Sequence, residues 1–288
     1  MRLRPAAITK GILAGVIFSG FLFIAAQAAD IVPFTDFSPA QVQSEPIVSA
    51  EKIHTRSAVL NEERELRVAT PSGYGQSQDA YPVLFVLDGD LNFAFTAEIA
   101  RYLADYRIIP SMIVVGVLNT ERNRDMTHNQ PVPAHARYTN AGGADRFLKF
   151  LAEEAIPGIE KRYRALPERT LVGHSLSGML TVYALLTRPD LFSGYIAISP
   201  SLWWNDFELL AKVQAFYKSH PTLKKKVFVS LADESEGDPA VYPRVKDAFE
   251  RSAPKELAVF VQFFMEDNHI STAVTSITSA LQKMFSTR

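Results

Sequence analysis

The ten residues from Arg169 to Gly178 constrain the fold of this chain more than any other stretch. They begin with the apolar run 170–172, which is typical of a buried strand, and continue through Gly-His-Ser-Leu-Ser-Gly into a segment with apolar residues at helical spacing. A strand, a sharp turn with a central serine and a helix make up a nucleophile elbow. The pattern therefore predicts that the turn lifts the hydroxyl of Ser175 clear of the sheet.

The turn needs small residues two positions before and two positions after the serine, because it brings backbone segments close together. Gly173 meets this need. Ser177 stands where the usual pattern has glycine, which is a departure, although serine is small enough to fit. A motif this short also occurs by chance, so its meaning depends on the rest of the chain.

Strands and helices alternate along the rest of the sequence. Apolar runs predict strands at 81–87, 112–118, 195–198, 227–231 and 257–264, after an opening hairpin of 54–60 and 66–70. Helical spacing predicts helices at 92–106, 145–163, 206–220, 240–251 and 271–285, with a kink or a new start at Pro157. This order predicts one α/β domain over 51–288, in which helices cover both faces of a mostly parallel sheet. Ligands of such sheets bind beyond the carboxyl ends of the strands, where Ser175 is expected.

Composition excludes several classes of function. The chain has 288 residues, a formal net charge of −1 and no cysteine. The absence of cysteine rules out disulfides, thiolate metal sites and cysteine nucleophiles. The near-neutral charge gives no electrostatic footprint for nucleic acid, so we expect no nucleic-acid partner, and nothing in the sequence indicates a metal or a cofactor.

The N-terminus has the organisation of a secretory signal peptide. Arg2, Arg4 and Lys10 precede the apolar stretch 11–26, and Ala-Gln-Ala at 26–28 is a small-x-small cleavage site. The alternative is a retained membrane anchor, but the apolar stretch is shorter than the roughly 20 residues of a spanning helix. We expect residues 1–28 to be removed on export to the periplasm or the exterior, leaving no stable membrane insertion. Residues 29–50 then form an arm or linker.

Serine chemistry needs a base, and His269 is the strongest of the six histidines. In an α/β hydrolase the order along the chain is Ser, acid, His, and His269 follows the last predicted strand. His174 adjoins Ser175, so its side chain leaves the backbone in another direction. Of the remaining histidines, His54 and His220 are most simply surface residues. His128 and His135 lie in the long polar loop 119–143, where a solvated histidine is the commoner case, although either could line the pocket.

The acid that orients the base remains open among three residues. Asp233, Glu234 and Glu236 all follow the strand at 227–231, and at least two of them must be solvated loop charges. We favour Glu234. The oxyanion of the reaction needs backbone donors, and one of these is expected to be the N–H of Leu176. The other is expected at Gly89 or Asp90, although Gly89 also suits a plain turn.

Substrate contacts are predicted from two further features. Trp203 and Trp204 follow the strand 195–198 and are either core residues or a pocket wall, the position favouring the wall for at least one. Arg122 and Arg124 lie in the long polar loop 119–143 and could hold an anionic or catecholate-bearing ester. Alternatively, Arg124 pairs with Asp125 or another carboxylate and only staples the loop.

Beyond these local features, the chain resembles the putative-esterase family of α/β-hydrolases, which includes feruloyl esterases, S-formylglutathione hydrolases and siderophore esterases. The segments that carry the resemblance are YPVLFVLDGDLNF, MIVVGVLNTERNRDMT, GGADRFLKFLAEEAIPGIEKRYRALPERTLVGHSLSG, IAISPSLWW and EDNHIST. The resemblance implies an α/β-hydrolase fold, with the nucleophile at Ser175 and the base at His269. It places the acid at the strand end 232–234, where Ala232 replaces the usual glycine. The pattern is most similar to the subgroup related to siderophore lactone esterases.

Two functions follow as alternatives. The first is a serine carboxylic-ester hydrolase that acts on a small-molecule ester through an acyl-enzyme, with a siderophore lactone among the candidate substrates. The second is an exported binding module that keeps a hydrolase fold for ligand capture, which the departures at Ser177 and Ala232 motivate.

Overall fold

The computed structural model describes residues 50–130, 133, 138–233 and 241–287. The expected signal peptide, the arm up to residue 49 and the favoured acid Glu234 lie outside the described residues.

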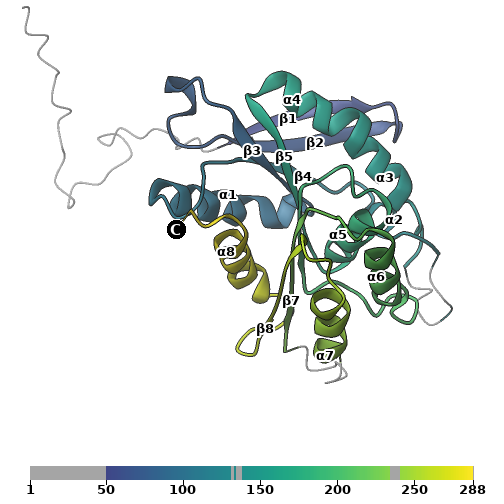
Figure 1. Cartoon of the computed structure of the whole chain (residues 1–288). Coiled ribbons are helices and arrows are strands. Elements are labelled where there is room, and N and C mark those ends of the chain that lie inside the picture. The colour runs from purple at the N-terminus through teal and green to yellow at the C-terminus, as the bar shows by residue number, and fades with distance from the viewer. Residues whose placement is uncertain (1–49, 131–132, 134–137, 234–240, 288) are drawn as a thin grey trace, which may run out of the picture. The chain divides into compact units, whose positions relative to one another are not determined.

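Eight strands form a single sheet in the order β1-β2-β4-β3-β5-β6-β7-β8 (Figure 1). The strands are β1 (Glu51–Ser57), β2 (Glu62–Ala69), β3 (Tyr81–Val86), β4 (Ile113–Val117), β5 (Ala165–His174), β6 (Gly194–Ile198), β7 (Lys226–Ala232) and β8 (Ala258–Phe264). The hairpin β1–β2 joins the sheet antiparallel to β4. All pairs from β4 to β8 are parallel. The predicted α/β-hydrolase fold with a mostly parallel sheet is confirmed.

Helices cover both faces of this sheet, as Figure 1 shows. They are α1 (Gly89–Asp105), α2 (Arg122–Met126), α3 (Ala144–Phe150), α4 (Ile156–Arg162), α5 (Leu176–Thr187), α6 (Glu208–Ser219), α7 (Val241–Lys246) and α8 (Thr272–Phe285). α1 and α8 pack on one face, in a core that includes Phe93 and Ile277. α3 to α6 pack on the other face, in a core that includes Phe147, Met179 and Val213. These two apolar layers bury both faces of the central strands, which explains why those strands are apolar throughout.

The helix predicted around Pro157 is divided into three parts. α3 ends at Phe150, a π-helical turn spans Leu151–Ala155, and α4 begins at Ile156 with Pro157 in its first turn. Both joins keep helical backbone angles, since Leu151 has φ −58° and ψ −45° and Ile156 has φ −61° and ψ −53°. The helix therefore continues through Pro157 and does not start anew there. Proline has no N–H to donate, and the π-helical turn just before it is the irregularity found at this point.

Two boundaries differ from the prediction in the part of the molecule that carries the site. α1 begins at Gly89, three residues before the apolar periodicity shows it, because its first turn is held by backbone bonds to Asp88 O. The loop predicted at 119–143 contains the short helix α2, which has no apolar period of its own.

The parallel strands bring four chain segments to one edge of the sheet. Val86 of β3 pairs with Val172 of β5, so these two strands end at nearly the same level. The carboxyl ends of β7 and β8 reach the same edge, since both strands are parallel to β5 and β6.

In the described part of the chain, no helix is long and apolar enough to cross a membrane.

Candidate active site

The elbow has the strained geometry that the sequence predicts. Ser175 lies between the end of β5 and the start of α5, with φ 62° and ψ −121°. A positive φ is unfavourable for a residue with a Cβ, and such strain is typical of functional positions. A Cβ at Gly173 would lie 2.1 Å from the carbonyl oxygen of Ser177, so only glycine fits there. The turn thus depends on Gly173, as predicted, and it raises Ser175 at the edge of the sheet.

Ser177 fits the elbow because its hydroxyl has buried partners. Its side chain is fully buried, and its Oγ lies 2.7 Å from Oδ2 of Asp88. The backbone N–H of His174 donates to the same Oγ at 2.8 Å. The departure from glycine therefore places a hydroxyl with hydrogen-bond partners beneath the turn.

His269 approaches the serine from the loop between β8 and α8. Its Nε2 lies 3.0 Å from Oγ of Ser175. This is hydrogen-bond distance between a histidine nitrogen and a serine hydroxyl, as nucleophile activation requires. The two residues are 94 positions apart in sequence, and the parallel sheet brings them together.

His174 supports the loop that carries His269. Its Nε2 lies 2.7 Å from the backbone oxygen of His269. A carbonyl oxygen only accepts, so Nε2 of His174 carries the hydrogen. Burial, assisted by the nearby His269, lowers the pKa of His174, which keeps this ring neutral. Sequence reasoning set His174 aside as unable to reach Ser175, and did not foresee its contact with the backbone of His269.

The loop predicted to supply the acid runs beside the histidine loop. Asp233, which directly follows β7, donates its backbone N–H to the oxygen of Asp267 at 3.1 Å. The side chain of Asp233 is exposed. Glu234 and Glu236 lie outside the described residues.

Two helix starts face the same edge of the sheet. Leu176 is the first residue of α5, and Gly89 and Asp90 are the first two residues of α1. Backbone N–H groups in the first turn of a helix have no acceptor within the helix, and they carry partial positive charge. The N–H of Leu87 donates to Val172 O at 2.9 Å, which joins the end of β3 to β5 just before the elbow. This edge can therefore stabilise an anionic oxygen.

Asp88 is the centre of a buried network that the sequence did not reveal. Its side chain accepts hydrogen bonds from Ser177, Arg122 and Asn119. Nε and Nη2 of Arg122 lie 2.7 and 2.9 Å from the two carboxylate oxygens. Asn119 also donates to Asp90. Burial alone would raise the pKa of Asp88, but the hydrogen bonds and positive charge of Arg122, together with the other two donors, lower it. Asp88 is therefore a buried carboxylate.

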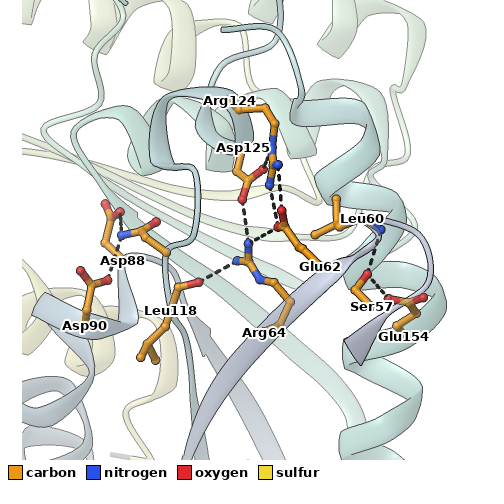
Figure 2. Close-up of polar contacts among 11 residues, drawn as sticks. Ser57, Leu60, Glu62, Arg64, Asp88, Asp90, Leu118, Arg124, Asp125 and Glu154 are labelled. Carbon is orange, nitrogen blue, oxygen red and sulfur yellow. Dashed lines mark hydrogen bonds and ion pairs between the residues drawn. The ribbon is translucent and has the colours of Figure 1, made fainter. Parts of the chain in front are cut away.

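Arg124 lies in a separate cluster with β2. Figure 2 shows its guanidinium between Glu62 and Asp125. Nε donates to Asp125 at 2.7 Å, and Nη1 and Nη2 donate to Glu62 at 2.9 and 2.7 Å. Arg64, which is buried, donates to the same two carboxylates and to the backbone oxygen of Leu118. These contacts fix α2 to β2, which is the arrangement expected if Arg124 has the structural role of holding the loop 119–143 in place.

The two tryptophans differ in burial. Trp204 is 1% exposed, and its Nε1 donates to Oδ1 of Asn129 at 2.9 Å. Trp203 is half-buried and lies 6.0 Å, between ring centroids, from Trp204 and from Tyr138. Of the pair, Trp203 is the more exposed, and it is therefore the better candidate for a pocket wall.

A second hydroxyl lies beside the nucleophile. Oγ of Ser201 is 3.4 Å from Oγ of Ser175, and the N–H of Ser201 donates to Ser175 O at 3.1 Å. Ser201 was not among the site residues predicted from the sequence.

Among the described residues, no group of three or more His, Cys, Asp or Glu side chains is placed to hold a metal ion. The arrangement supports acyl transfer through an activated serine.

Comparison with known proteins gives the same picture. The family model described as "Putative esterase" matches residues 57–241. Ferri-bacillibactin esterase BesA of Bacillus subtilis is 30% identical over 225 residues, which cover 70% of this chain and 78% of that protein. The siderophore triacetylfusarinine C esterase of Aspergillus fumigatus is 33% identical over 148 residues, which cover 48% of this chain and 50% of that protein.

A solved structure is similar over most of the described domain. It is that of an IroE-like serine hydrolase from Shewanella oneidensis, with a TM-score of 0.72 and 31% sequence identity. The match covers 82% of this chain and 80% of that one.

Proposed function

Since the chain belongs to the putative esterase family, we propose that it hydrolyses carboxylic esters through an acyl-enzyme on Ser175. The observation that carries this proposal is the 3.0 Å distance between Ser175 Oγ and His269 Nε2 at the strained elbow. A serine hydroxyl becomes an effective nucleophile when a base in hydrogen-bond contact accepts its proton. The comparisons support an esterase, and the geometry supports these two residues as its reacting pair.

The reaction divides into acylation and deacylation. In acylation, Nε2 of His269 takes the hydroxyl proton while Oγ of Ser175 attacks the ester carbonyl carbon. The carbonyl oxygen becomes an oxyanion, which accepts hydrogen bonds from the N–H of Leu176 and from that of Gly89 or Asp90. Collapse of the intermediate expels the alcohol, which takes the proton from His269. In deacylation a water molecule repeats these steps, releasing the acid and restoring the serine.

We assign the orienting acid to Glu234. A carboxylate that accepts a hydrogen bond from Nδ1 of the base holds the ring in the correct tautomer and stabilises its charged form. The hydrogen bond from the N–H of Asp233 to Asp267 O supports this assignment, because it holds Asp233, which precedes Glu234 in sequence, against the loop that carries His269.

The proposed substrate is a siderophore ester, in particular a catecholate-bearing lactone. The names of the two relatives described above support this class: one is a ferri-bacillibactin esterase and the other a siderophore triacetylfusarinine C esterase. Arg122 supports it physically, because two of its three guanidinium nitrogens are held by Asp88 and its side chain is still 35% exposed. A fixed and accessible guanidinium suits catecholate oxygens. Trp203 would supply the aromatic wall.

We further propose that the enzyme is exported and that residues 1–28 are its signal peptide. The basic start, the apolar stretch 11–26 and the Ala-Gln-Ala at 26–28 support this assignment. Mass measurement of the protein recovered from a cell that expresses the full chain tests it. A mature N-terminus at Ala29 is the expected result, and a protein that keeps residues 1–28 in the membrane fraction would instead indicate an anchor.

Substitution of Ser175 tests the central assignment. Ser175→Ala should lower turnover of a short-chain aryl ester by ~10³-fold or more, because the nucleophile is removed. Wild type should react with a fluorophosphonate label at Ser175, and the variant should not. Ser219→Ala is a matched control, since this serine is an exposed hydroxyl at the end of α6. Near-wild-type turnover by Ser175→Ala would refute the assignment, and a folded wild type that neither labels nor hydrolyses activated esters would favour ligand binding alone.

A further inference from the structure

A short buried hydrogen bond joins the two segments that carry the proposed oxyanion donors. Ser177 Oγ lies 2.7 Å from Asp88 Oδ2, and the two side chains belong to residues that are 0% and 1% exposed. In sequence, Asp88 directly precedes Gly89 and Ser177 directly follows Leu176. The bond thus connects the neighbour of one proposed donor with the neighbour of the other.

The hydroxyl of Ser177 has a local alternative. Its Oγ also lies 2.8 Å from the backbone oxygen of His174, within its own turn. A hydroxyl has one hydrogen to donate, and an ionised carboxylate at a short distance is a stronger acceptor than a neutral carbonyl. The hydrogen is therefore directed to Asp88, and the hydroxyl reaches across to the other segment although its own turn could satisfy it.

Asp88 is itself held firmly. Oδ1 accepts from Nε of Arg122 at 2.7 Å and from Asn119 at 2.8 Å, and Oδ2 accepts from Nη2 of Arg122 at 2.9 Å as well as from Ser177. Both oxygens therefore have two donors each, and the carboxylate has a single orientation. A carboxylate with a fixed orientation can hold its hydrogen-bond partner Ser177 in a defined position, which a mobile surface carboxylate cannot do.

The backbone on both sides of this bond is strained. Asp88 has φ 50° and ψ 45°, and Ser175 has φ 62°, so both residues lie in left-handed conformations that favour glycine. Such conformations persist only where the surrounding contacts fix them. The bond between Ser177 and Asp88 is one contact that restrains both turns at once.

We propose that Ser177 and Asp88 are positioning residues whose hydrogen bond sets the separation of the oxyanion donors at Gly89 and Leu176. The inference rests on the proposed function, since it takes these two N–H groups as the oxyanion site. Where the usual elbow has glycine, this chain has a hydroxyl that ties the elbow to the start of α1. The departure at position 177 is then a functional part of this site.

The test separates transition-state binding from ground-state binding. For p-nitrophenyl butyrate, Ser177→Ala should lower kcat by ~10- to 100-fold and change KM by less than about threefold. Loss of a whole oxyanion donor lowers kcat by ~10²–10³-fold, and the smaller effect is expected because Ser177→Ala displaces a donor without removing it. An alkyl trifluoromethyl ketone forms a tetrahedral adduct with the serine and needs the same donors. Its Ki should rise by about the factor by which kcat/KM falls.

Two further comparisons and one control keep the test decisive. Ser177→Gly installs the residue usual at this position, so it should fold, and it should show the same loss as Ser177→Ala. In an Asp88→Asn background, Ser177→Ala should cost much less than in wild type, because the two residues act through one bond. Thr96→Val is the matched control. Thr96 is fully buried on α1, and among the described residues its hydroxyl bonds only to Asn92 O of its own helix, so kcat and Ki should stay within about twofold.

The proposal is overturned if Ser177→Ala and Ser177→Gly keep kcat and the ratio of Ki to KM within about twofold of wild type, or if the losses add fully to those of Asp88→Asn. It is also overturned if Thr96→Val loses as much as Ser177→Ala, since the effect would then follow from general loosening of the fold. Failure of the proposed function would look different, because Ser175→Ala would remain active.

Discussion

Two hydrogen bonds join Arg122 to Asp88, from Nε to Oδ1 at 2.7 Å and from Nη2 to Oδ2 at 2.9 Å. Burial lowers the pKa of Arg122, but the hydrogen bonds and negative charge of Asp88 more than offset this, so its pKa is raised and its charge is permanent. Arg124, two residues further on, uses all three guanidinium nitrogens on Glu62 and Asp125. The two arginines of α2 thus have different surroundings, and this difference can be tested.

Substitutions of Arg122 and Arg124 should have different effects on substrate preference, measured with a panel of short alkyl, feruloyl-type and catecholate-lactone esters. Arg122→Lys should lower the preference for the catecholate lactone over the alkyl ester by ~10-fold or more. The reason is that an ammonium group cannot make the two-point contact with catecholate oxygens that a guanidinium can make. The ratio of kcat/KM between substrates is the readout, since any effect on Asp88 applies to both esters. Arg124→Met should leave that ratio unchanged and lower stability by about 1–2 kcal/mol. An unchanged preference in Arg122→Lys would remove the physical support for a siderophore ester.

Trp203 and Trp204 should also differ. Trp204→Phe should lower the free energy of unfolding by about 1–3 kcal/mol, because it leaves a cavity and removes one of the two donors to the Asn129 oxygen, Asn205 being the other. Trp203→Ala should mainly raise KM for aromatic esters, by about 3- to 10-fold, with smaller effects on alkyl esters. Urea unfolding and the ester panel measure the two outcomes. Equal KM changes for aromatic and alkyl esters would argue against Trp203 as an aromatic wall.

The sequence predicted the fold well because the signals for it are local. Apolar runs and helical periods identified the strands and most helices, and their alternation predicted the parallel sheet, which is confirmed. The exceptions have a common cause. α2 is only five residues long and has no apolar period, and the first turn of α1 is set by bonds to Asp88. Neither feature leaves a pattern in the hydrophobic residues.

The site could be predicted only in part. Ser175 and His269 were chosen from motif and chain order, and the structure brings their side chains to 3.0 Å, while their catalytic roles remain predictions. The network of Asp88 was missed because its partners are distant: Arg122 is 34 residues away and Ser177 is 89 residues away. Such contacts depend on the register of the strands and on side-chain direction, which no short stretch of sequence encodes.

The acid assignment is tested by three single substitutions. Glu234→Gln should lower turnover the most, by up to ~10⁴-fold, because the amide cannot hold His269 in the required tautomer or stabilise its charged form. Asp233→Asn and Glu236→Gln serve as matched controls from the same loop, and each should stay within about threefold of wild type, since solvated loop charges contribute little. If Glu236→Gln is the damaged variant, the acid lies two residues further along the loop.

His128 should make stability depend on pH. Its side chain is 4% exposed, its ring stacks on Tyr183 with centroids 5.0 Å apart, and its Nε2 lies 3.3 Å from Glu208. Burial lowers the pKa of His128, and the opposing effect of Glu208 is not sufficient to restore it. Within the described part of the chain, Nδ1 is buried and has no hydrogen-bond partner, so a second proton on the ring would find no acceptor there.

The sign follows from which state takes up the proton. The unfolded chain protonates this histidine near its ordinary pKa of 6.5, whereas the folded protein does so only at a lower pH. Between these two pKa values the unfolded state binds more protons, so the free energy of unfolding falls as the pH falls. Above pH 6.5 the contribution is constant. His174, whose pKa is also lowered, acts in the same direction.

Urea unfolding at pH 8, 6.5 and 5 measures this effect. The wild type should lose stability between pH 6.5 and 5. His128→Phe keeps the aromatic stack on Tyr183 and removes the titrating group, so it should lose less over the same interval. Titration of Glu208 in the folded protein does not contribute between pH 6.5 and 5. The hydrogen bond from Lys212 and its other partners lower the pKa of Glu208 to about 2. An equal loss of stability in wild type and His128→Phe would show that His128 is not the group that titrates.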